Sequence, residues 1–248
     1  GVPFGLNAKE MNAWVNRGGG LEIWRELYEP FNIYPIPCGN TGTQMFGWFN
    51  KEINSLDDLK GLKMRIPGVG GEVFKRAGGN PVNIPGGELY TAMQTGTIDA
   101  VEWVGPYNDL AFGFQQVAKY YYYPGWHEPG SMLELLVNDD AWDSLPTDLQ
   151  VIIETAAKAV NQDLLDEYTA YNNKALKELI ETHGVELRRL PEEVIMEFKK
   201  ISDEIIKESL NDETIRKVYA SFKDFLDEVS DYHSIAEDAF IEARSSSD

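Results

Sequence analysis

The chain has 248 residues, which permits one large domain or two modest ones with a substantial buried core. Acidic residues outnumber Lys and Arg by 41 to 22, and the resulting net charge of −19 argues against nucleic acid or an anionic membrane surface as a partner. No apolar run approaches the roughly 20 residues that a membrane-spanning helix needs. The single cysteine, Cys38, excludes an intramolecular disulfide and says little about the compartment.

The N-terminal part of the chain predicts two helices and then two strands. Asn7 is a suitable N-cap for the first helix, and the glycines that follow residue 17 end it. Pro35 and Pro37 confine the first strand to a sheet edge or a hinge, because proline cannot donate a ladder hydrogen bond. The expected helices cover residues 8–16 and 21–31, and the expected strands cover residues 33–38 and 44–49.

The middle of the chain alternates short strands with short helices. In order, KMRIP, GEVFKRAG, PVNIP, ELYTAMQTG and IDAVEW read as β-α-β-α-β between residues 63 and 103. Strands that alternate with helices of this length predict a parallel sheet with crossover connections. A helix over residues 106–118 and strands over residues 120–123 and 131–138 follow.

From residue 146 on, the chain is dominated by helical patterns. The first covers residues 146–184 and is about three times longer than an average globular helix, which suggests that it spans two lobes. A short strand, VELRRLP, precedes two more helices over residues 191–210 and 212–243. The expected fold class is therefore α/β.

Arg65 lies in a short strand of otherwise apolar residues. Met64 and Ile66 alternate with it, so that Arg65 and Lys63 share one strand face while the apolar pair faces the core. An arginine is most often exposed on the surface or engaged in a structural salt bridge. Pro67 ends the strand at once, however, and places Arg65 at the carboxyl end, where open α/β sheets bind ligands. Since a guanidinium keeps its charge and pairs bidentately with carboxylates, we expect an anion there.

The segment QTGTIDAVEW, residues 94–103, offers a second candidate at a strand end. A glycine turn follows an amphipathic helix and leads into a strand that finishes in Glu102 and Trp103. An isolated Glu at a strand end is usually only solvated. Here apolar residues flank it and the chain turns directly into a helix, so we expect Glu102, and Trp103 as a substrate-binding residue, among the ligand-contacting groups of the sheet.

The motifs GLKMRIPG and QTGTIDA, in this order and with a helix and a strand between them, resemble those of the solute-binding proteins of tripartite ATP-independent periplasmic (TRAP) transporters. The resemblance implies a periplasmic binding protein-like fold of two α/β lobes with a ligand cleft, a long spanning helix and a C-terminal helical extension. Residues 1–38 and 103–133 are expected in an incomplete lobe I, residues 39–102 and 134–190 in lobe II, and residues 191–248 in the C-terminal helices. The chain starts without a signal peptide, and we expect about the first third of the family's usual chain to be absent.

The resemblance also implies roles for individual residues. In the family, the arginine of the first motif grips the substrate carboxylate, which gives that role to Arg65. In the branch that binds 2-oxo and 2-hydroxy acids, a Glu-Trp pair holds a metal ion through the Glu side chain and the Trp carbonyl, and the substrate bridges to the ion. Glu102 and Trp103 occupy those positions here. Hard oxygen ligands of this kind suit sodium, calcium or magnesium and not zinc.

Three more residues join this implied site. The segment GNTGTQ resembles the same branch and implies Gln44 as a metal ligand through its amide oxygen and a substrate contact through its amide hydrogens. Asn40 in that turn is a weaker substrate contact, because Asn favours turns for backbone reasons alone. Glu128 would complete the oxygen shell of the cation opposite Glu102. Its neighbour His127 could alternatively be a catalytic base, but no nucleophile motif accompanies it.

The function implied is that of an extracytoplasmic solute receptor in the periplasm. It would bind a small 2-oxo or 2-hydroxy carboxylate with a bridging Na or Ca cation and no organic cofactor, and deliver it to a TRAP membrane permease. One alternative is a metal-free dicarboxylate or sugar-acid receptor of the same family. Another is a carboxylate-ligated metal enzyme acting on 2-oxo acids, which has little support because the chain lacks G-x-S-x-G, Walker A and H-E-x-x-H motifs.

The last predicted helix, residues 212–243, carries apolar residues at helical spacing, many of them aromatic. Ordinary packing on the chain's own core is the simple interpretation. In the oxo-acid branch, this helix reaches across to a second protomer. The resemblance therefore implies a homodimer held through the C-terminal helix.

Overall fold

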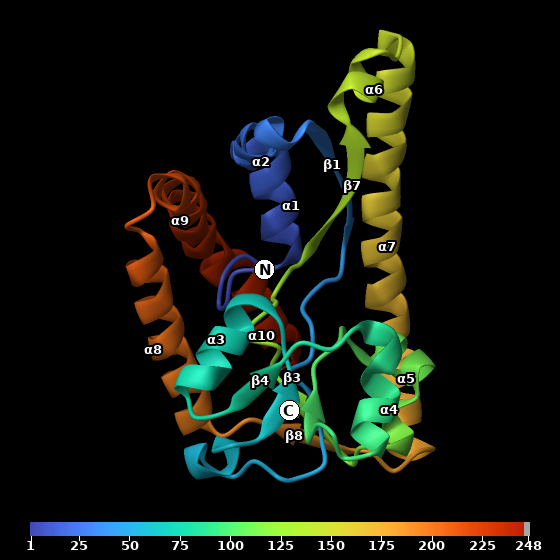
Figure 1. Cartoon of the computed structure of the whole chain (residues 1–248), viewed down its shortest axis with the longest axis vertical. Coiled ribbons are helices and arrows are strands. Elements are labelled where there is room, and N and C mark those ends of the chain that lie inside the picture. The colour runs from blue at the N-terminus through green and yellow to red at the C-terminus, as the bar shows by residue number, and fades with distance from the viewer. Residues whose placement is uncertain (246–248) are drawn as a thin grey trace.

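The computed structural model describes residues 1–245, and its elements follow the predicted order (Figure 1). The helices are α1 (Ala8–Arg17), α2 (Gly20–Tyr28), α3 (Gly68–Arg76), α4 (Leu89–Gln94), α5 (Pro106–Phe112), α6 (Asp139–Asp143), α7 (Thr147–Glu181), α8 (Glu192–Ser209), α9 (Glu213–His233) and α10 (Ala239–Ser245). The strands are β1 (Ile33–Asn40), β2 (Gly47–Phe49), β3 (Lys63–Arg65), β4 (Asn80–Val82), β5 (Ala100–Val101), β6 (Tyr120–Tyr123), β7 (Met132–Asn138) and β8 (Glu186–Arg189). Within these residues, no helix is both long and apolar enough to cross a membrane.

A six-stranded sheet occupies the lower part of the molecule in Figure 1, with the strand order β4-β3-β5-β2-β6-β8. β3 pairs in parallel with both β4 and β5, which confirms the parallel units predicted between residues 63 and 103. β2 pairs antiparallel with β5 and β6 and so joins these units to the parallel pair of β6 and β8.

Both faces of this sheet are buried, because successive residues of its central strands point to opposite sides. On β2, Trp48 lies in an apolar cluster with residues of α4 and α7, whereas Phe49 lies in a cluster with residues of α3 and α8. Tyr121 and Tyr122 of β6 divide between the same two clusters. Helices on both faces thus hold the sheet rigid, and its strand ends form a fixed platform.

A separate antiparallel pair, β1 with β7, runs beside α7 in the upper part of Figure 1. In the described part of the chain, β1 pairs with no other strand, which agrees with the edge position predicted from its prolines. α7 is confirmed as one helix of 35 residues, about 50 Å long. It packs on the six-stranded sheet through Leu179 and on the β1–β7 pair through Ala157, so it links the two sheets.

The structure corrects one predicted strand boundary and leaves the predicted division into lobes untested. The strand predicted over residues 44–49 is wrong in its first half, because β2 starts at Gly47 and Gln44 lies in the preceding loop. There its backbone N–H donates to the Glu128 carbonyl oxygen at 3.1 Å instead of to a strand neighbour. In addition, β6 from the range assigned to lobe I pairs with β2 from the range assigned to lobe II, so the division of residues between lobes stays a proposal.

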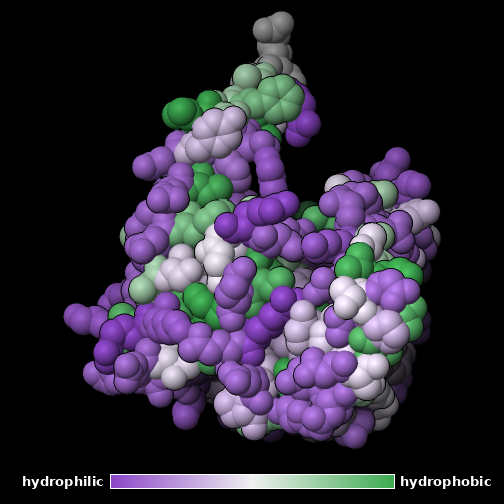
Figure 2. Space-filling model, turned by 90° about the horizontal axis from the view of Figure 1, so that it is seen from above, coloured by the Kyte–Doolittle hydropathy of each residue, from purple (hydrophilic) through white to green (hydrophobic). Residues whose placement is uncertain are grey.

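The predicted C-terminal helix is continuous apart from one π-helical stretch, Ser234–Asp238, between α9 and α10. Its first half packs on its own chain, where Phe222 meets Trp14 edge to face at 5.4 Å. Its second half is bonded to α1 by His233 Nδ1 and Glu10 Oε1 at 2.7 Å and by the ion pair of Lys9 with Glu237 at 2.5 Å. Its apolar side chains are exposed nevertheless, and Figure 2 shows apolar side chains on the protruding arm. Tyr232, Ile235 and Phe240 there are 64, 76 and 61% exposed.

Candidate functional site

The pairing of β3 with β5 brings the two sequence motifs together. The strands run in parallel with Arg65 opposite Val101, and the Glu102 N–H continues the ladder by donating to the Arg65 carbonyl oxygen at 3.0 Å. Met64 and Ile66 are buried, as predicted, which leaves Arg65 on the other face at the carboxyl end of its strand. Residues 37 positions apart therefore share one sheet edge.

Arg65, Glu102 and Trp103 are in mutual contact at this edge. The Arg65 Nη1 donates to the Glu102 carbonyl oxygen at 2.9 Å and to Glu102 Oε2 at 3.0 Å. The guanidinium carbon lies 5.3 Å from the centre of the Trp103 ring, within range of a cation–π contact. The side chains of Arg65 and Glu102 are only 14% and 2% exposed. Within residues 1–245, the buried Nε of Arg65 has no acceptor and both hydrogen bonds of its side chain use Nη1, so the side of the guanidinium formed by Nε and Nη2 is open to an anion.

Gln44 and Glu128 form a second group. The Gln44 amide nitrogen donates to Glu128 Oε2 at 2.7 Å and to Thr41 Oγ1 at 3.2 Å. Ser131 Oγ also donates to Glu128 Oε2, at 2.7 Å. The Gln44 amide oxygen is buried and has no donor among the described residues. Such an oxygen requires a partner, because burying an unbonded polar atom costs roughly 1 to 3 kcal/mol.

The two groups are connected through neighbouring residues. The Met45 N–H donates to the Val104 carbonyl oxygen at 3.1 Å, which ties the residue after Gln44 to the residue after Trp103. His127, next to Glu128, places its Nε2 3.6 Å from Glu102 Oε1, which is beyond hydrogen-bond distance. Both His127 ring nitrogens are buried without a partner in the described part of the chain. An imidazole in that state is a poor candidate for a catalytic base, because nothing orients its tautomer.

Asn40, at the end of β1, is fully buried and already engaged. Its Oδ1 accepts from the Gly42 N–H at 3.0 Å, a turn-forming bond, and its Nδ2 donates to Asn12 Oδ1 at 3.4 Å. The structure therefore supports the interpretation that an Asn stands at position 40 because it stabilises the turn. A substrate contact by Asn40 stays a prediction.

The oxygen atoms at this edge suit a hard cation. Among residues 1–245, no three His, Cys, Asp or Glu side chains gather closely enough to form a metal site by themselves. The available donors are instead mixed: the unbonded Gln44 amide oxygen, and Glu102 Oε1, which the Arg65 hydrogen bond leaves free. Amide and carboxylate oxygens are ligands of sodium and calcium rather than of zinc, so the residues fit the cation implied by the sequence.

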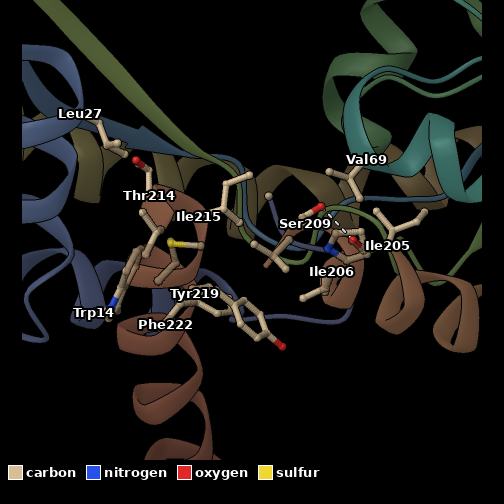
Figure 3. A pocket seen from close by; sticks show the side chains of 15 residues that line it. Trp14, Leu27, Val69, Ile205, Ile206, Ser209, Thr214, Ile215, Tyr219 and Phe222 are labelled. Atoms are coloured by element: carbon tan, nitrogen blue, oxygen red, sulfur yellow. Dashed lines mark hydrogen bonds between the residues drawn. The ribbon is translucent and has the colours of Figure 1, made fainter. Parts of the chain in front are cut away.

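An apolar cavity of about 480 Å³ lies elsewhere, between the N-terminal segment, α1, α8 and α9 (Figure 3). Trp14, Ile205, Tyr219 and Phe222 line it, together with other apolar residues, and none of its lining side chains is an acid or a base. It contains none of the site residues predicted from the sequence. A small carboxylate and a metal ion have nothing to bind there.

Comparison with known proteins gives one consistent answer. The model of the family "Bacterial extracellular solute-binding protein, family 7" matches residues 1–213. A monocarboxylate 2-oxoacid-binding periplasmic protein of Nostoc sp. is 45% identical over 247 residues, which cover 99% of this chain and 68% of that protein.

Two solved structures extend this similarity. A TRAP transporter solute-binding protein of Bordetella bronchiseptica, described as a mixed-occupancy dimer with calcium and picolinate, is 42% identical. It has a TM-score of 0.95 over 98% of this chain and 73% of that one. A TRAP periplasmic solute-binding protein of Pseudoalteromonas atlantica with sodium and pyruvate is 45% identical, with a TM-score of 0.93 over 97% of this chain and 74% of that one.

Proposed function

This chain belongs to the bacterial extracellular solute-binding proteins of family 7, and we propose that it binds a small 2-oxo or 2-hydroxy monocarboxylate together with a sodium or calcium ion. The membership confirms the resemblance drawn from its two motifs. The protein is thus a periplasmic solute-binding protein of the TRAP type and not an enzyme. In the proposed function, it delivers its ligand to a TRAP membrane permease.

The buried pairing of Arg65 with Glu102 is the observation that carries the proposal. The two side chains cancel each other's charge, and Glu128 leaves the site with one formal negative charge. On a protein of net charge −19, such a site repels a monocarboxylate. A calcium ion reverses the sign of the site, and a sodium ion neutralises it. A bound cation would therefore offset the negative charge of the site and allow Arg65 to bind an anionic ligand.

In the proposed site, some of these residues bind the cation and others bind the ligand. The Gln44 amide oxygen, the Glu102 and Glu128 carboxylates and the Trp103 carbonyl would hold the cation, which when bound supplies positive charge to the ligand's oxygens. Arg65 would donate its outer N–H groups to the ligand carboxylate, and the Trp103 ring would cover the guanidinium. A contact of Gln44 or Asn40 with the ligand's second oxygen would require an amide hydrogen to leave its present acceptor, which is Glu128 or Thr41 for Gln44 and Asn12 for Asn40.

The two sheets provide the two lobes of this proposal. The six-stranded sheet carries Arg65 and Glu102 at its edge, whereas β1 and β7 with α1 and α2 form the other lobe, and α7 spans both. Closure of the lobes around the ligand would exclude water and strengthen the charge pairs. The residue ranges predicted for the lobes would then shift, with residues 103–123 assigned to the larger sheet.

Calorimetric titration tests the function. We expect potassium pyruvate in potassium buffer to bind the chelator-treated protein only when calcium or sodium is added, and the potassium salts of succinate and galacturonate to bind at least a hundredfold more weakly. Carboxylate binding that survives complete removal of calcium and sodium would favour the metal-free dicarboxylate or sugar-acid receptor instead.

We also propose a homodimer held through the C-terminal helix. The apolar arm with Ile235, Phe240 and Ile241 is exposed in the single chain, and exposed apolar clusters of this kind mark protein contacts. The Bordetella relative is described as a dimer, which supports the association without locating it. The arm, and not the first half of α9, is the part available to a second copy, since Phe222 is buried in its own chain.

A further inference from the structure

Asp109 is a buried carboxylate that the proposed ligand site does not use. It lies on α5 and is 1% exposed. Its Oδ1 accepts from the backbone N–H groups of Val104 and Gly105, both at 3.1 Å. Its Oδ2 accepts from Trp48 Nε1 at 2.9 Å and from the Tyr121 hydroxyl at 2.7 Å. The carboxylate therefore receives four donors, which fills the lone pairs of both its oxygens.

The four donors come from two different parts of the molecule. Trp48 and Tyr121 are fully buried on neighbouring strands β2 and β6, and their rings stack with centroids 4.1 Å apart. Val104 and Gly105, in contrast, belong to the turn that leaves β5 immediately after Glu102 and Trp103. One oxygen of Asp109 thus holds the rigid sheet, and the other holds the turn.

That turn carries the groups assigned to the ion and the ligand. The Glu102 carbonyl accepts from Arg65, and the Val104 carbonyl accepts from the Met45 N–H next to Gln44. A rotation of the peptides at residues 103–105 would redirect these carbonyls and the Trp103 ring together. Fixing two consecutive N–H groups of a turn to the sheet prevents this rotation.

We infer that Asp109 is a positioning residue for the site: its carboxylate clamps the turn after β5 so that Glu102 and the Trp103 carbonyl keep the geometry in which they bind the cation. The inference rests on the proposed function. A carboxylate is required because only an acceptor on both oxygens serves four donors. An asparagine turns an N–H₂ group toward two of them, and a leucine leaves all four unpaired.

The test compares Asp109→Asn with two other variants. Tyr121→Phe removes one donor on the sheet side and leaves both turn bonds in place. Val194→Ala, in the opposite core cluster, is the control for loss of stability alone. Calcium chloride and potassium pyruvate are titrated in turn by calorimetry at a temperature at which all variants are folded. Hydrogen exchange of a peptide that contains residues 104 and 105 is measured in parallel.

We expect Asp109→Asn to weaken calcium binding, and pyruvate binding in calcium, at least tenfold and to speed exchange at residues 104 and 105. Tyr121→Phe should weaken both about two- to fivefold, and Val194→Ala should lower only the melting temperature. Wild-type affinity in folded Asp109→Asn would overturn the inference while leaving the proposed function intact. If Asp109→Asn does not fold, wild-type affinity and slow exchange in Tyr121→Phe overturn it. If the wild-type protein binds no carboxylate in calcium or sodium, the proposed function fails and the inference fails with it.

Discussion

Arg65 is the residue on which ligand affinity should depend most. Arg65→Lys keeps the positive charge but loses the planar guanidinium that pairs with both oxygens of a carboxylate. Arg65→Ala also leaves the buried Glu102 carboxylate without its guanidinium partner. We expect each variant to weaken pyruvate binding by about 2 to 4 kcal/mol, the range of a buried charge-assisted contact. Lys63→Ala is the matched control, since Lys63 lies on the same strand with an exposed side chain. Calorimetry that finds equal affinities for Arg65→Lys and Lys63→Ala would contradict the assigned role.

Substitution of Glu102 should weaken cation binding without unfolding the protein. Glu102→Gln keeps the size of the side chain and an oxygen for Arg65, but removes the charge that attracts a cation. We expect calcium binding to weaken by about 1.5 to 3 kcal/mol, the scale of hydrogen bonds and contacts to charged groups, with a folded protein by circular dichroism. Glu197→Gln on α8, which removes a partly exposed carboxylate paired with Lys200, should bind calcium normally. A calcium affinity that is the same in both variants would rule out Glu102 as a ligand.

Asp109 should make stability depend on pH. Burial raises its pKa from 3.8 to about 6, while hydrogen bonds from Tyr121, Trp48 and the Val104 N–H act in the opposite direction. Because the folded-state pKa lies above the unfolded one, folding favours the protonated acid. The ionised carboxylate therefore costs stability above pH 6, and this cost disappears as the pH falls toward 4. The full effect is about 3 kcal/mol.

Chemical denaturation of the wild type and of Asp109→Asn between pH 4 and 8 measures this effect. The asparagine does not titrate, so the difference between the two free energies of unfolding isolates Asp109. We expect the wild type to gain relative to the variant on going from pH 7 to pH 4. A difference that does not change with pH would show that the carboxylate has no raised pKa.

The sequence could predict the site residues that carry a local signature, and not those defined by distant partners. Arg65 and Glu102 stand at strand ends in recognisable motifs, and the structure places them in contact. Asp109 has no such signature, because its four donors come from β2, β6 and a turn. Only the acid's position in the first turn of a helix is visible in the sequence, and that position usually indicates a solvated cap.

At the scale of elements, periodicity predicted most helices and the parallel strands, and it failed at irregular backbone. The strand expected from Gln44 begins only at Gly47, which has φ of 140°. The pattern gave no sign of this break, since QMFGWF is a short, mostly apolar run of the kind that a fully buried strand shows. The π-helical stretch at Ser234–Asp238 likewise leaves no trace in apolar spacing. Such features depend on which neighbour the backbone meets, and a single sequence does not contain that information.

Gly47 should be essential to the sheet next to the site. A Cβ there would lie 2.4 Å from the Val101 carbonyl oxygen, and the positive φ disfavours any other residue. Gly47→Ala should therefore destabilise the protein by about 2 kcal/mol or more by forcing β2 away from β5. Gly87→Ala, with no atom within 4 Å of the new Cβ, should change stability little. Equal denaturation midpoints for the two variants would argue against a rigid β2–β5 contact.

At the scale of the whole molecule, the proposed dimer depends on the C-terminal arm. The helical spacing of apolar residues predicted one long helix. It could not separate the first half, whose apolar side chains pack on the chain's own core, from the second half, whose apolar side chains are exposed, because both halves carry the same pattern. Burial of Phe222 and exposure of Phe240 make this distinction in the structure. Truncating the whole helix would therefore uncover the chain's own core as well as the proposed dimer contact. Point substitutions in the arm are the cleaner test.

We expect the intact chain to be a dimer and the double variant Ile235→Glu with Phe240→Glu to be a monomer with a normal ligand site. Two charges on an apolar contact oppose association through desolvation and, in a two-fold dimer, through repulsion between copies. Met196→Glu is the matched control, because Met196 is 65% exposed on α8, away from the arm. Light scattering over a wide concentration range distinguishes the states, and calorimetry with calcium and pyruvate checks the site. A wild-type chain that stays monomeric at every concentration would reject the dimer. A double variant that stays dimeric would move the contact elsewhere, since the arm is then not what holds the two copies together.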